Sequence, residues 1–492
     1  MSRIIIQNGN MCELDLPLKF AQKLYAEFAI RHPNAFYLRT RQRGMQNWDG
    51  KIHYINKHGE FKIGLLPAVY EKCTEYGIKP KVVDMRQPLP KVSKVVTKIG
   101  EYKLRPEQEK AVKAVINNKV GKVPFQIGVL DYTVNAGKTL IMSSLYLSYK
   151  KQLKTLLITN DSDWLNQARD EFKKYLPGEQ ITFVQGKVLN WSNFTIGMVQ
   201  SISRNMRFYQ NELAKVDMVL VDEADQAGSK QYQNVLTRLF NTRVRIGLSG
   251  TIYMSKLAKD KVKNMNLEVF FGKVLAEFKL KDSIKKGYST RTIVKMVPSK
   301  PWYGNWESEE VSYKEVYDDS ITFNKYARKM VYARLKWNIK QGRYPALVVC
   351  KFIAHCEKLC KYFKKKLGSN YNIACVHVDT PSKIRQQIMK DFREGKIDIL
   401  VSTTIIARGK NFPKLRYLLN AASMDSQEKS IQFLGRLVRT DSSKKKVYLD
   451  DLHYPGPYLN RHGKHRKQYY QKQELKVILL EKIWKNHPIH SL

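Results

Sequence analysis

The stretch VLDYTVNAGKTLIMSSLYL, Val129–Leu147, decides the fold class of this chain. It begins with an apolar run that predicts a strand, turns at Gly137, Lys138 and Thr139, and continues as an apolar run that predicts a helix. In the phosphate-binding pattern G-x-x-x-x-G-K-[ST], backbone N–H groups and the helix N-terminus face an anion. Tyr132 stands here at the position of the first glycine. Taken alone, the stretch does not separate a phosphate loop from an ordinary strand–turn–helix corner.

The residues of this turn nevertheless suit phosphate binding. Lys138 offers a positive charge to the terminal phosphates of a nucleotide, and the Thr139 hydroxyl is a ligand for Mg²⁺. Asn135 belongs to a residue type that tolerates unusual backbone dihedral angles, so we expect it to compensate for the missing glycine. The candidate phosphate-binding segment therefore consists of Asn135, Ala136, Gly137, Lys138 and Thr139.

Short apolar runs alternate with helical stretches along most of the chain. The predicted strands are 127–131, 155–159, 195–198, 218–221, 245–248, 346–350, 373–377, 397–401, 417–421 and 446–449. Apolar strands joined by helical crossovers predict parallel sheets that are buried on both faces. A break near residue 305 divides the strands into two sets of five, so we expect an α/β protein with two doubly wound lobes.

We expect four domains from these breaks. They are a small α+β N-terminal domain at 1–90, a first lobe at 96–300, a second lobe at 310–452 and a basic helical extension at 453–492. The extension reads as a basic helix followed by an amphipathic helix that packs on the second lobe. Contact of Arg461, Lys464, Arg466 and Lys467 with a nucleic-acid backbone is an added hypothesis.

Polar residues follow two of the predicted strands of the first lobe. Asp222, Glu223 and Asp225 come directly after the run at 218–221, at the end of a strand where open α/β sheets bind ligands. We expect Asp222 to hold Mg²⁺ through water and Glu223 to polarise an attacking water, rather than to form a plain solvated turn. Ser249 and Thr251 follow the next strand and are candidate coupling residues.

The stretch IQFLGRLVRT carries two arginines on one face of a predicted helix. Gln432, Gly435, Arg436 and Arg439 have the spacing i, i+3, i+4 and i+7, which places them on that face. Guanidinium groups one turn apart suit a phosphate that is being transferred. Because these residues belong to the second lobe, we expect them to act only when the lobes close.

In order and spacing these stretches resemble the motifs of superfamily 2 helicases, over roughly residues 100–452. Further stretches that resemble family motifs are YKLRPEQEKAV, LLITNDSDWLNQARDEF, GMVQS, ALVVCKFIAHCEKL and ILVSTTIIARGKNFPKL. The resemblance implies RecA-like lobes, ATP and Mg²⁺ as cofactors, and ATP hydrolysis coupled to movement along nucleic acid. The implied catalytic residues are Lys138, Asp222, Glu223, Gln432, Arg436 and Arg439. It also assigns Arg105 and Gln108 to the adenine side, Gly409 to the nucleotide, and Gln200, Ser201, Ser402 and Thr403 to nucleic acid.

Within this superfamily the chain resembles the phage UvsW-type helicases. The resemblance rests on the divergent phosphate loop, the segment AGSKQYQNVL, and an N-terminal module with RQRGMQNWDGKIHYINKHGEFKIGLL. It implies action on branched DNA (forks, junctions and R-loops, the last with RNA) in phage replication, recombination and repair. A single-strand-binding or recombination protein is an expected partner. Tyr132 and Asn411 depart from the usual motifs, Asn411 where many relatives have Asp.

The charge of the chain points to a polyanionic partner. Lys and Arg number 87 against 44 Asp and Glu, a formal net charge of +43, and counterion release from a nucleic-acid backbone would add affinity. In the N-terminal module Arg39, Arg41, Arg43 and Lys51 alternate with aromatic residues, and we expect these cations to contact DNA.

Other classes of protein and site are less favoured by the sequence. The 6 cysteines include no CxxC pair, which favours buried thiols over a zinc site. With no apolar run of about 18 residues and no apparent signal segment, we expect a cytoplasmic protein, in the host if phage-encoded. Three alternatives stay open: an RNA helicase, because Asp222–Asp225 spells the letters of the RNA-directed group; a nucleic-acid-binding protein with a decayed motor; and the motor of a restriction system.

Overall fold

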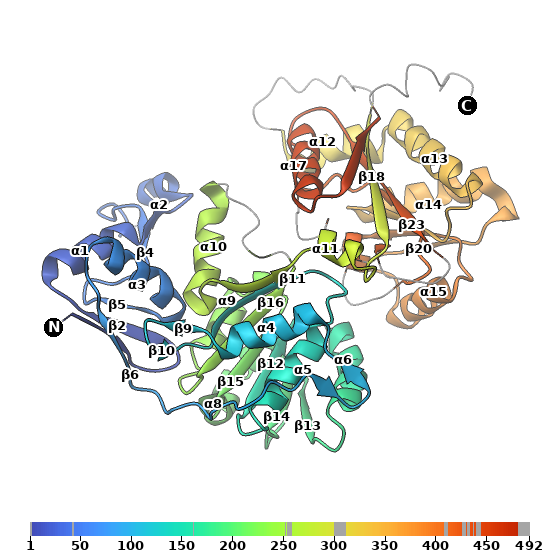
Figure 1. Ribbon diagram of the computed structural model, residues 1–492. Helices are drawn as coiled ribbons and strands as arrows, with labels where there is room; N and C mark the ends of the chain where they lie inside the picture. The colour runs from blue at the N-terminus through green and yellow to red at the C-terminus, as the bar shows by residue number, and fades with distance from the viewer. Residues whose placement is uncertain are drawn as a thin grey trace. The chain divides into compact units, whose positions relative to one another are not determined.

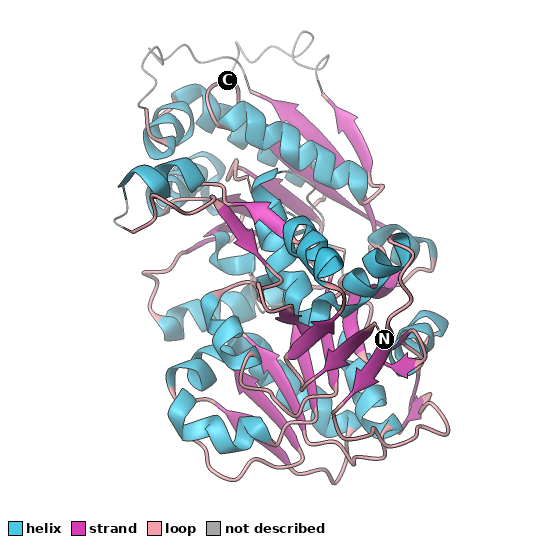
Figure 2. Ribbon diagram, turned by 90° about the vertical axis from the view of Figure 1, so that its left-hand side faces the viewer, coloured by secondary structure: helices cyan, strands magenta, loops and turns pink. Residues whose placement is uncertain are grey.

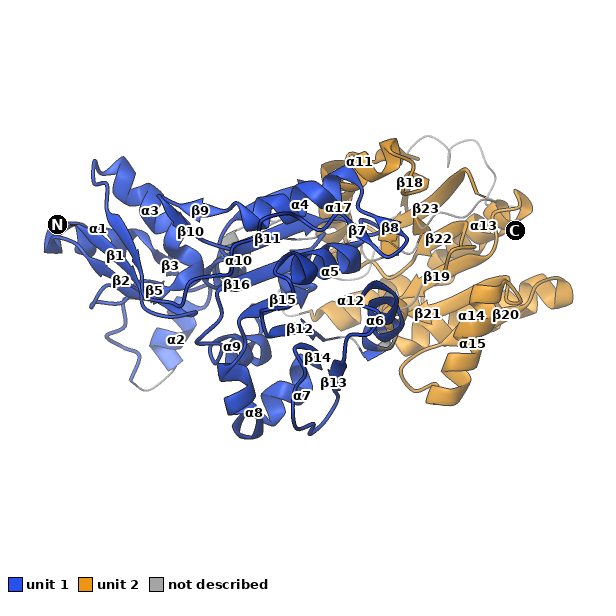
Figure 3. Cartoon of the chain, turned by 60° about the horizontal axis from the view of Figure 1, so that its bottom comes forward, with its two compact units in different colours: residues 1–278 blue, residues 279–492 orange. Residues whose placement is uncertain are grey.

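The computed structural model describes most of the chain and divides it into two compact units. The described residues are 2–41, 44–160, 162–250, 252, 258–299, 311–407, 412–425, 430, 433–435, 437–438 and 444–480. The first unit comprises residues 1–278 and the second residues 279–492 (Figure 3). We describe each unit by itself.

The first unit begins with a small α+β module, drawn in dark blue in Figure 1. Its main sheet has the order β5-β2-β1-β6, formed by β1 (Arg3–Ile6), β2 (Met11–Asp15), β5 (Glu60–Lys62) and β6 (Lys81–Asp84). A second sheet pairs β3 (Ala29–Arg31) with β4 (Lys51–His53), and the helices are α1 (Leu18–Glu27), α2 (Ala35–Arg41) and α3 (Leu66–Glu75). The module is docked on the lobe that follows: the buried Arg245 donates to the carbonyl of Gly9 and the side chain of Asn10, and Tyr54 donates to Asn266.

A seven-stranded parallel sheet forms the rest of the first unit, with the order β13-β14-β12-β15-β16-β11-β17. Its strands are β11 (Ile127–Tyr132), β12 (Thr155–Thr159), β13 (Ile181–Val184), β14 (Phe194–Met198), β15 (Met218–Asp222), β16 (Val244–Ser249) and β17 (Val274–Phe278). Every residue of β11, β12, β15 and β16 is buried, as expected for parallel strands covered on both faces.

Helices and two short hairpins complete this lobe. The helices are α4 (Pro106–Ile116), α5 (Lys138–Ser148), α6 (Ser162–Tyr175), α7 (Val199–Arg204), α8 (Met206–Ala214), α9 (Lys230–Leu236) and α10 (Ala258–Phe271). The hairpins pair β7 (Lys98–Ile99) with β8 (Tyr102–Lys103) and β9 (Lys119–Val120) with β10 (Val123–Pro124). In Figure 2 helices flank the strands of each large sheet.

The second unit is built on another seven-stranded parallel sheet, with the order β20-β21-β19-β22-β23-β18-β24. Its strands are β18 (Arg291–Pro298), β19 (Ala346–Cys350), β20 (Ile373–Val376), β21 (Ile399–Thr403), β22 (Tyr417–Asn420), β23 (Lys446–His453) and β24 (Lys476–Leu479). The α-helices described in this unit are α11 (Leu280–Lys285), α12 (Tyr313–Tyr317), α13 (Lys325–Lys340), α14 (Ile353–Leu367), α15 (Ser382–Glu394) and α17 (Leu459–Lys472).

The predicted α/β fold with two parallel sheets is confirmed, but the boundaries differ from those expected. Residues 291–298, which we assigned to the first lobe, form the strand β18, which pairs with β23 and β24 of the second sheet, so the division falls after Phe278. Of the segment after α17, where we expected an amphipathic helix, the structure describes the residues up to Leu480, and these include the strand β24. Residues 453–480 therefore complete the second lobe and do not form a separate extension.

A buried ion pair fixes α17 to this lobe. Arg466 has no exposed surface, and its Nη2 and Nε lie 2.8 and 3.0 Å from Oδ1 of Asp451 on β23. Asp451 also accepts hydrogen bonds from Tyr470 and Asn420. The hypothesis that Arg466 contacts a nucleic-acid backbone is therefore wrong, although Arg461 on the same helix is exposed.

The cysteines are mostly inside the protein, as predicted. Cys375 is partly exposed and the other five are buried. The helices of the described residues are all too short or too polar to cross a membrane.

Candidate nucleotide site and nucleic-acid interface

The turn between β11 and α5 has the backbone that the sequence predicts for a phosphate loop. Asn135 and Gly137 both adopt left-handed conformations, with φ of 65° and 71°, and Gly137 caps the N-terminus of α5. The expectation that Asn135 takes an unusual dihedral angle is confirmed. A turn of this kind, followed at once by a helix N-terminus, directs backbone N–H groups toward an anion.

Tyr132, which replaces the first glycine of the usual pattern, does not obstruct the loop. It is the last residue of β11, its side chain is fully buried, and its hydroxyl donates to the carbonyl of Glu107 at 2.7 Å. Its ring packs against Phe278. Because the turn is made at Asn135 and Gly137, the strand can end in a large side chain without loss of the loop.

Gln108 and Arg105 support the loop from α4. The Gln108 amide donates to the carbonyl of Ala136 at 2.8 Å and accepts from the backbone N–H of Arg105, so it also caps the start of α4. Arg105 donates to the carbonyl of Asn135 at 3.3 Å. We expected both residues on the adenine side, but Gln108 is only 2% exposed and both ends of its amide are bound to the protein. In this structure Gln108 holds the loop.

The Gly137→Ala substitution is expected to weaken ATP binding by roughly tenfold or more. A left-handed conformation costs a residue with a Cβ about 1–2 kcal/mol, and at Gly137 that Cβ would also overlap the Gln108 amide nitrogen. Titration with a fluorescent ATP analogue measures the loss. Gly178→Ala is the matched control, because Gly178 has a similar φ of +76° and open space around it. Equal affinities for the two variants would contradict this account of the loop.

The acidic residues lie at the carboxyl end of β15, next to the loop. The Lys138 Nζ is 3.8 Å from Oδ1 of Asp222, the last residue of β15, so the predicted lysine and acid meet. Glu223 follows in a left-handed conformation with φ of 53° and is partly exposed. Such strain in a non-glycine residue is typical of functional sites.

The oxygen donors here fit a bound Mg²⁺ ion. Asp222 offers a carboxylate and Thr139, in the first turn of α5, a hydroxyl, and both are hard ligands. Among the described residues no three His, Cys, Asp or Glu side chains gather into a metal site. Mg²⁺ does not need such a cage, because it is commonly held by one or two protein ligands together with water and substrate phosphates.

Ser249 joins the acidic residues to the neighbouring strand. Its hydroxyl donates to Oδ1 of Asp225 at 2.8 Å, and both side chains are buried. This contact fits the coupling role expected for Ser249. Thr251, Gly409, Gln432, Arg436 and Arg439 lie outside the described residues.

A chain of amides that we did not predict leads away from the acidic residues. Asn160, directly after β12, donates through its side chain to Gln226, which follows the acidic residues. Gln200, at the start of α7, donates to the carbonyl of Asn160 at 3.2 Å. The sequence shows polar residues after the ends of two strands, but it does not show that these strands, β12 and β15, are neighbours.

The expected nucleic-acid contacts differ in their exposure. Gln200 and Ser201 are partly exposed at the start of α7. Ser402 and Thr403 are buried at the end of β21, and the Ser402 hydroxyl donates to the carbonyl of Thr403 at 3.0 Å. The structure therefore does not support a direct contact through Ser402 or Thr403.

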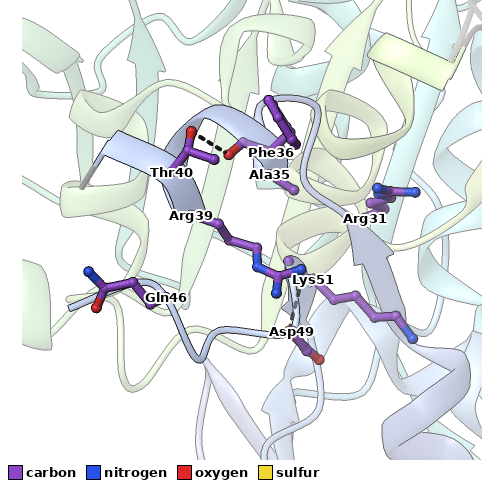
Figure 4. Close-up of a pocket in the computed structure, with 9 residues that line it drawn as sticks. Arg31, Ala35, Phe36, Arg39, Thr40, Gln46, Asp49 and Lys51 are labelled. Carbon is purple, nitrogen blue, oxygen red and sulfur yellow. Dashed lines mark hydrogen bonds between the residues drawn. The ribbon is translucent and has the colours of Figure 1, made fainter. Parts of the chain in front are cut away.

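The N-terminal module presents its cations around an open hollow of about 520 Å³ (Figure 4). Arg31, Arg39 and Lys51 line it from β3, α2 and β4, together with Phe36, whose side chain is 79% exposed. Arg41, on the same helix, is exposed as well, and Arg43 lies outside the described residues. The described cations that we expected to contact DNA, namely Arg39, Arg41 and Lys51, are thus exposed, as such a contact requires.

Comparison with known proteins places this geometry in a family. The family model "Helicase conserved C-terminal domain" matches residues 328–441, and "Type III restriction enzyme, res subunit" matches residues 101–254. The chain belongs to the superfamily 2 helicases. Its lobes correspond to the two RecA-like lobes of that family, and the motifs described above fall within the matched residues or beside them.

Individual relatives are distant but cover long stretches of the chain. The ATP-dependent DNA helicase uvsW of Enterobacteria phage T4 is 22% identical over 431 residues, which cover 82% of each chain. The putative ATP-dependent helicase IRC3 of Saccharomyces cerevisiae is 23% identical over 377 residues, 71% of this chain but only 51% of the yeast protein. The chain thus spans about half the length of that relative.

Among solved structures, Mss116p bound to ssRNA and AMP-PNP has a TM-score of 0.53 at 16% identity, covering 81% of this chain and 82% of that one. A likeness at this identity supports the fold and carries no information about the substrate.

Proposed function

We propose that this superfamily 2 helicase is an ATP-dependent translocase that remodels branched DNA, namely forks, junctions and R-loops, in phage replication, recombination and repair. The observation that carries the proposal is the meeting of Lys138 with Asp222 beside a loop whose backbone is set for phosphate. A decayed motor would not be expected to keep the strained Glu223 next to this pair.

The motif residues of the first lobe have roles that follow from their positions. The N–H groups of the loop and Lys138 bind the phosphates, and Thr139 and Asp222 hold Mg²⁺. When bound, Mg²⁺ neutralises charge that develops as the terminal phosphate is transferred to water. Glu223 orients that water and accepts its proton. We propose Gln432, Arg436 and Arg439, with Gly409, as the phosphate-facing residues that the second lobe contributes.

The substrate proposal rests on charge and on a relative. A net charge of +43 favours a nucleic acid, and the phage T4 relative is a DNA helicase by name. The hollow is lined by Arg31, Arg39 and Lys51, which outnumber the acid Asp49, and by the exposed Phe36, and it suits phosphates and an unpaired base, as a branch point offers. A single-strand-binding or recombination protein is the protein partner that such a substrate would bring.

The amide chain from Gln226 through Asn160 to Gln200 is expected to link ATP hydrolysis to nucleic-acid binding. Gln226→Ala removes the acceptor of the Asn160 amide. Loss of one such hydrogen bond costs about 1–2 kcal/mol, which corresponds to a roughly 5- to 30-fold smaller effect of bound DNA on the rate of ATP hydrolysis. We expect hydrolysis without nucleic acid to stay unchanged and its stimulation by DNA to fall by that factor. Titrations of the ATPase rate with DNA measure both, with the exposed Gln231→Ala as control. Equal loss of stimulated and unstimulated rates would contradict a coupling role.

A remodelling assay tests the proposed substrate. Labelled synthetic forks, plain DNA duplexes and RNA duplexes are incubated with the protein, ATP and Mg²⁺, and the products are separated on native gels. ATP-dependent conversion of the forks in preference to the other substrates supports the proposal. Unwinding of RNA duplexes alone would replace it with an RNA helicase, and binding of DNA without ATP turnover would replace it with a decayed motor.

A further inference from the structure

The second lobe carries a group of cations and aromatic rings that the proposed function does not use. We call it the Trp337 patch; it consists of Lys295 on β18, Arg334 and Trp337 on α13, Arg343 just after α13, and Tyr448 on β23. All of these elements lie in the second unit (Figure 3). The patch therefore does not depend on how the two units are placed.

The rings of the patch are surrounded by positive charge. The Lys295 Nζ lies 4.8 Å and the Arg343 Cζ also 4.8 Å from the centre of the Trp337 ring, and the Arg334 Cζ lies 5.1 Å from it. Arg343 stacks on Tyr448 at 3.6 Å. These cation–π contacts stabilise the arrangement, but they do not neutralise three like charges.

The acid nearest to these cations is already in use. The buried Asp450 accepts from Arg334 Nε at 2.8 Å and lies 2.7 Å from Arg334 Nη2, and it also accepts from Tyr417. Arg343 donates to the neutral amide of Asn338. Two positive charges of the patch, on Lys295 and Arg343, are left without a carboxylate partner among the described residues.

Lys295 shows the consequence of that imbalance. It is partly buried, and burial together with repulsion from Arg334 and Arg343 lowers its pKa, although Asp450 acts in the opposite direction. A half-buried cation that faces like charges is stabilised by an external anion. The patch is therefore a site that lacks its counter-charge.

The position of the patch separates it from the helicase motifs. Tyr448 is near the start of β23, where it pairs in register with Tyr417, the first residue of β22. The motif residues Ser402 and Thr403 are the last residues of β21, and therefore lie at the carboxyl ends of these parallel strands, whereas Tyr448 lies near the amino ends. Trp337 is 41% exposed, and Tyr344, next to Arg343, is exposed to the same extent.

We propose that the Trp337 patch binds the phosphate backbone of single-stranded nucleic acid. This site lies away from the carboxyl ends of the strands, where the motif residues Ser402 and Thr403 are found. Lys295 and Arg343 supply the charge for phosphates, and Trp337 and Tyr344 offer exposed ring surface to bases. These exposed rings favour a nucleic-acid strand over an acidic peptide, which would need only the cations. The inference rests on the proposed function, because a motor on branched DNA releases a strand that must be held.

Acetylation of lysines by a water-soluble N-hydroxysuccinimide ester, read by mass spectrometry, tests the patch directly. Bound oligothymidylate is expected to slow the acetylation of Lys295 at least fivefold, because a strand held by the patch would cover its ammonium group. Lys365, exposed on α14 of the same lobe, is the matched control and should be protected less than twofold. A polyglutamate peptide of equal charge is run in parallel. Protection by polyglutamate alone, or no protection of Lys295, overturns the proposal.

Variants give a second readout. Lys295→Gln and Arg343→Gln should each reduce the slope of log binding constant against log salt concentration for oligothymidylate by about 0.7. This corresponds to a loss of about fivefold in affinity at 0.1 M salt. Lys365→Gln should leave the slope unchanged. Hydrolysis of ATP without nucleic acid should be unchanged in all three. Protection of Lys295 in a protein that hydrolyses no ATP would leave the patch standing and refute the motor. Nucleic-acid-stimulated hydrolysis without protection of Lys295 would do the reverse.

Discussion

Glu223→Gln is expected to slow ATP hydrolysis by roughly 10²–10⁴-fold while ATP still binds. Glutamine keeps the size of the side chain and can occupy the same left-handed position directly after β15. It cannot accept the proton of the attacking water. The pair of Lys138 and Asp222, which binds the phosphates and the metal, is left in place. Steady-state turnover and titration with a fluorescent ATP analogue separate the two effects.

The control for this substitution is Glu101→Gln, which makes the same charge change at an exposed position of the same unit. It should leave turnover unchanged. If Glu223→Gln lost nucleotide binding and turnover together, Glu223 would be a structural residue. If it turned over ATP at the rate of the unaltered protein, another group would be the base.

Arg466→Met is expected to destabilise the second lobe by about 3–5 kcal/mol. Removal of the guanidinium leaves the carboxylate of Asp451, which has no exposed surface, without its cation. Tyr470 and Asn420 still donate to that carboxylate, but neutral donors do not compensate for a buried charge. The substitution also removes the bond from Arg466 to the carbonyl of Met424.

Urea unfolding followed by circular dichroism measures this loss as a shift of the transition that reports the second lobe. Lys464→Met is the matched control, because Lys464 is exposed on the same helix, and its midpoint should not move. DNA binding by folded Arg466→Met at low temperature should be normal. A loss of DNA affinity without loss of stability would restore the surface role that the structure denies to Arg466.

The sequence predicted strands best where burial is complete. β12 and β19 have the bounds expected from the pattern, since each is a short run of buried, mostly apolar residues. We predicted five strands in each lobe, and each sheet has seven. β13, β17, β18 and β24 were missed because partly exposed residues interrupt their patterns, as Lys295 does in β18. Nothing local shows that β18 pairs with β23, a strand far away in sequence. The boundary of the lobes was therefore misplaced.

For the nucleotide site, roles tied to one position were predictable and contacts between positions were not. The chemistry of Lys138 and the dihedral angle of Asn135 follow from residue type and motif. The contact between Asn160 and Gln226 depends on β12 lying next to β15, which only the sheet order reveals. The burial of Gln108 likewise depends on how α4 packs against the loop.

The most direct test of the central claim is the rate of ATP hydrolysis by the unaltered protein and by Lys138→Ala. The rate is measured without nucleic acid and with single-stranded, duplex and forked DNA. The account predicts that forked DNA stimulates hydrolysis most and that Lys138→Ala abolishes it, because Lys138 is the phosphate-facing cation beside Asp222. Hydrolysis that nucleic acid does not stimulate, or that persists in Lys138→Ala, would contradict the account.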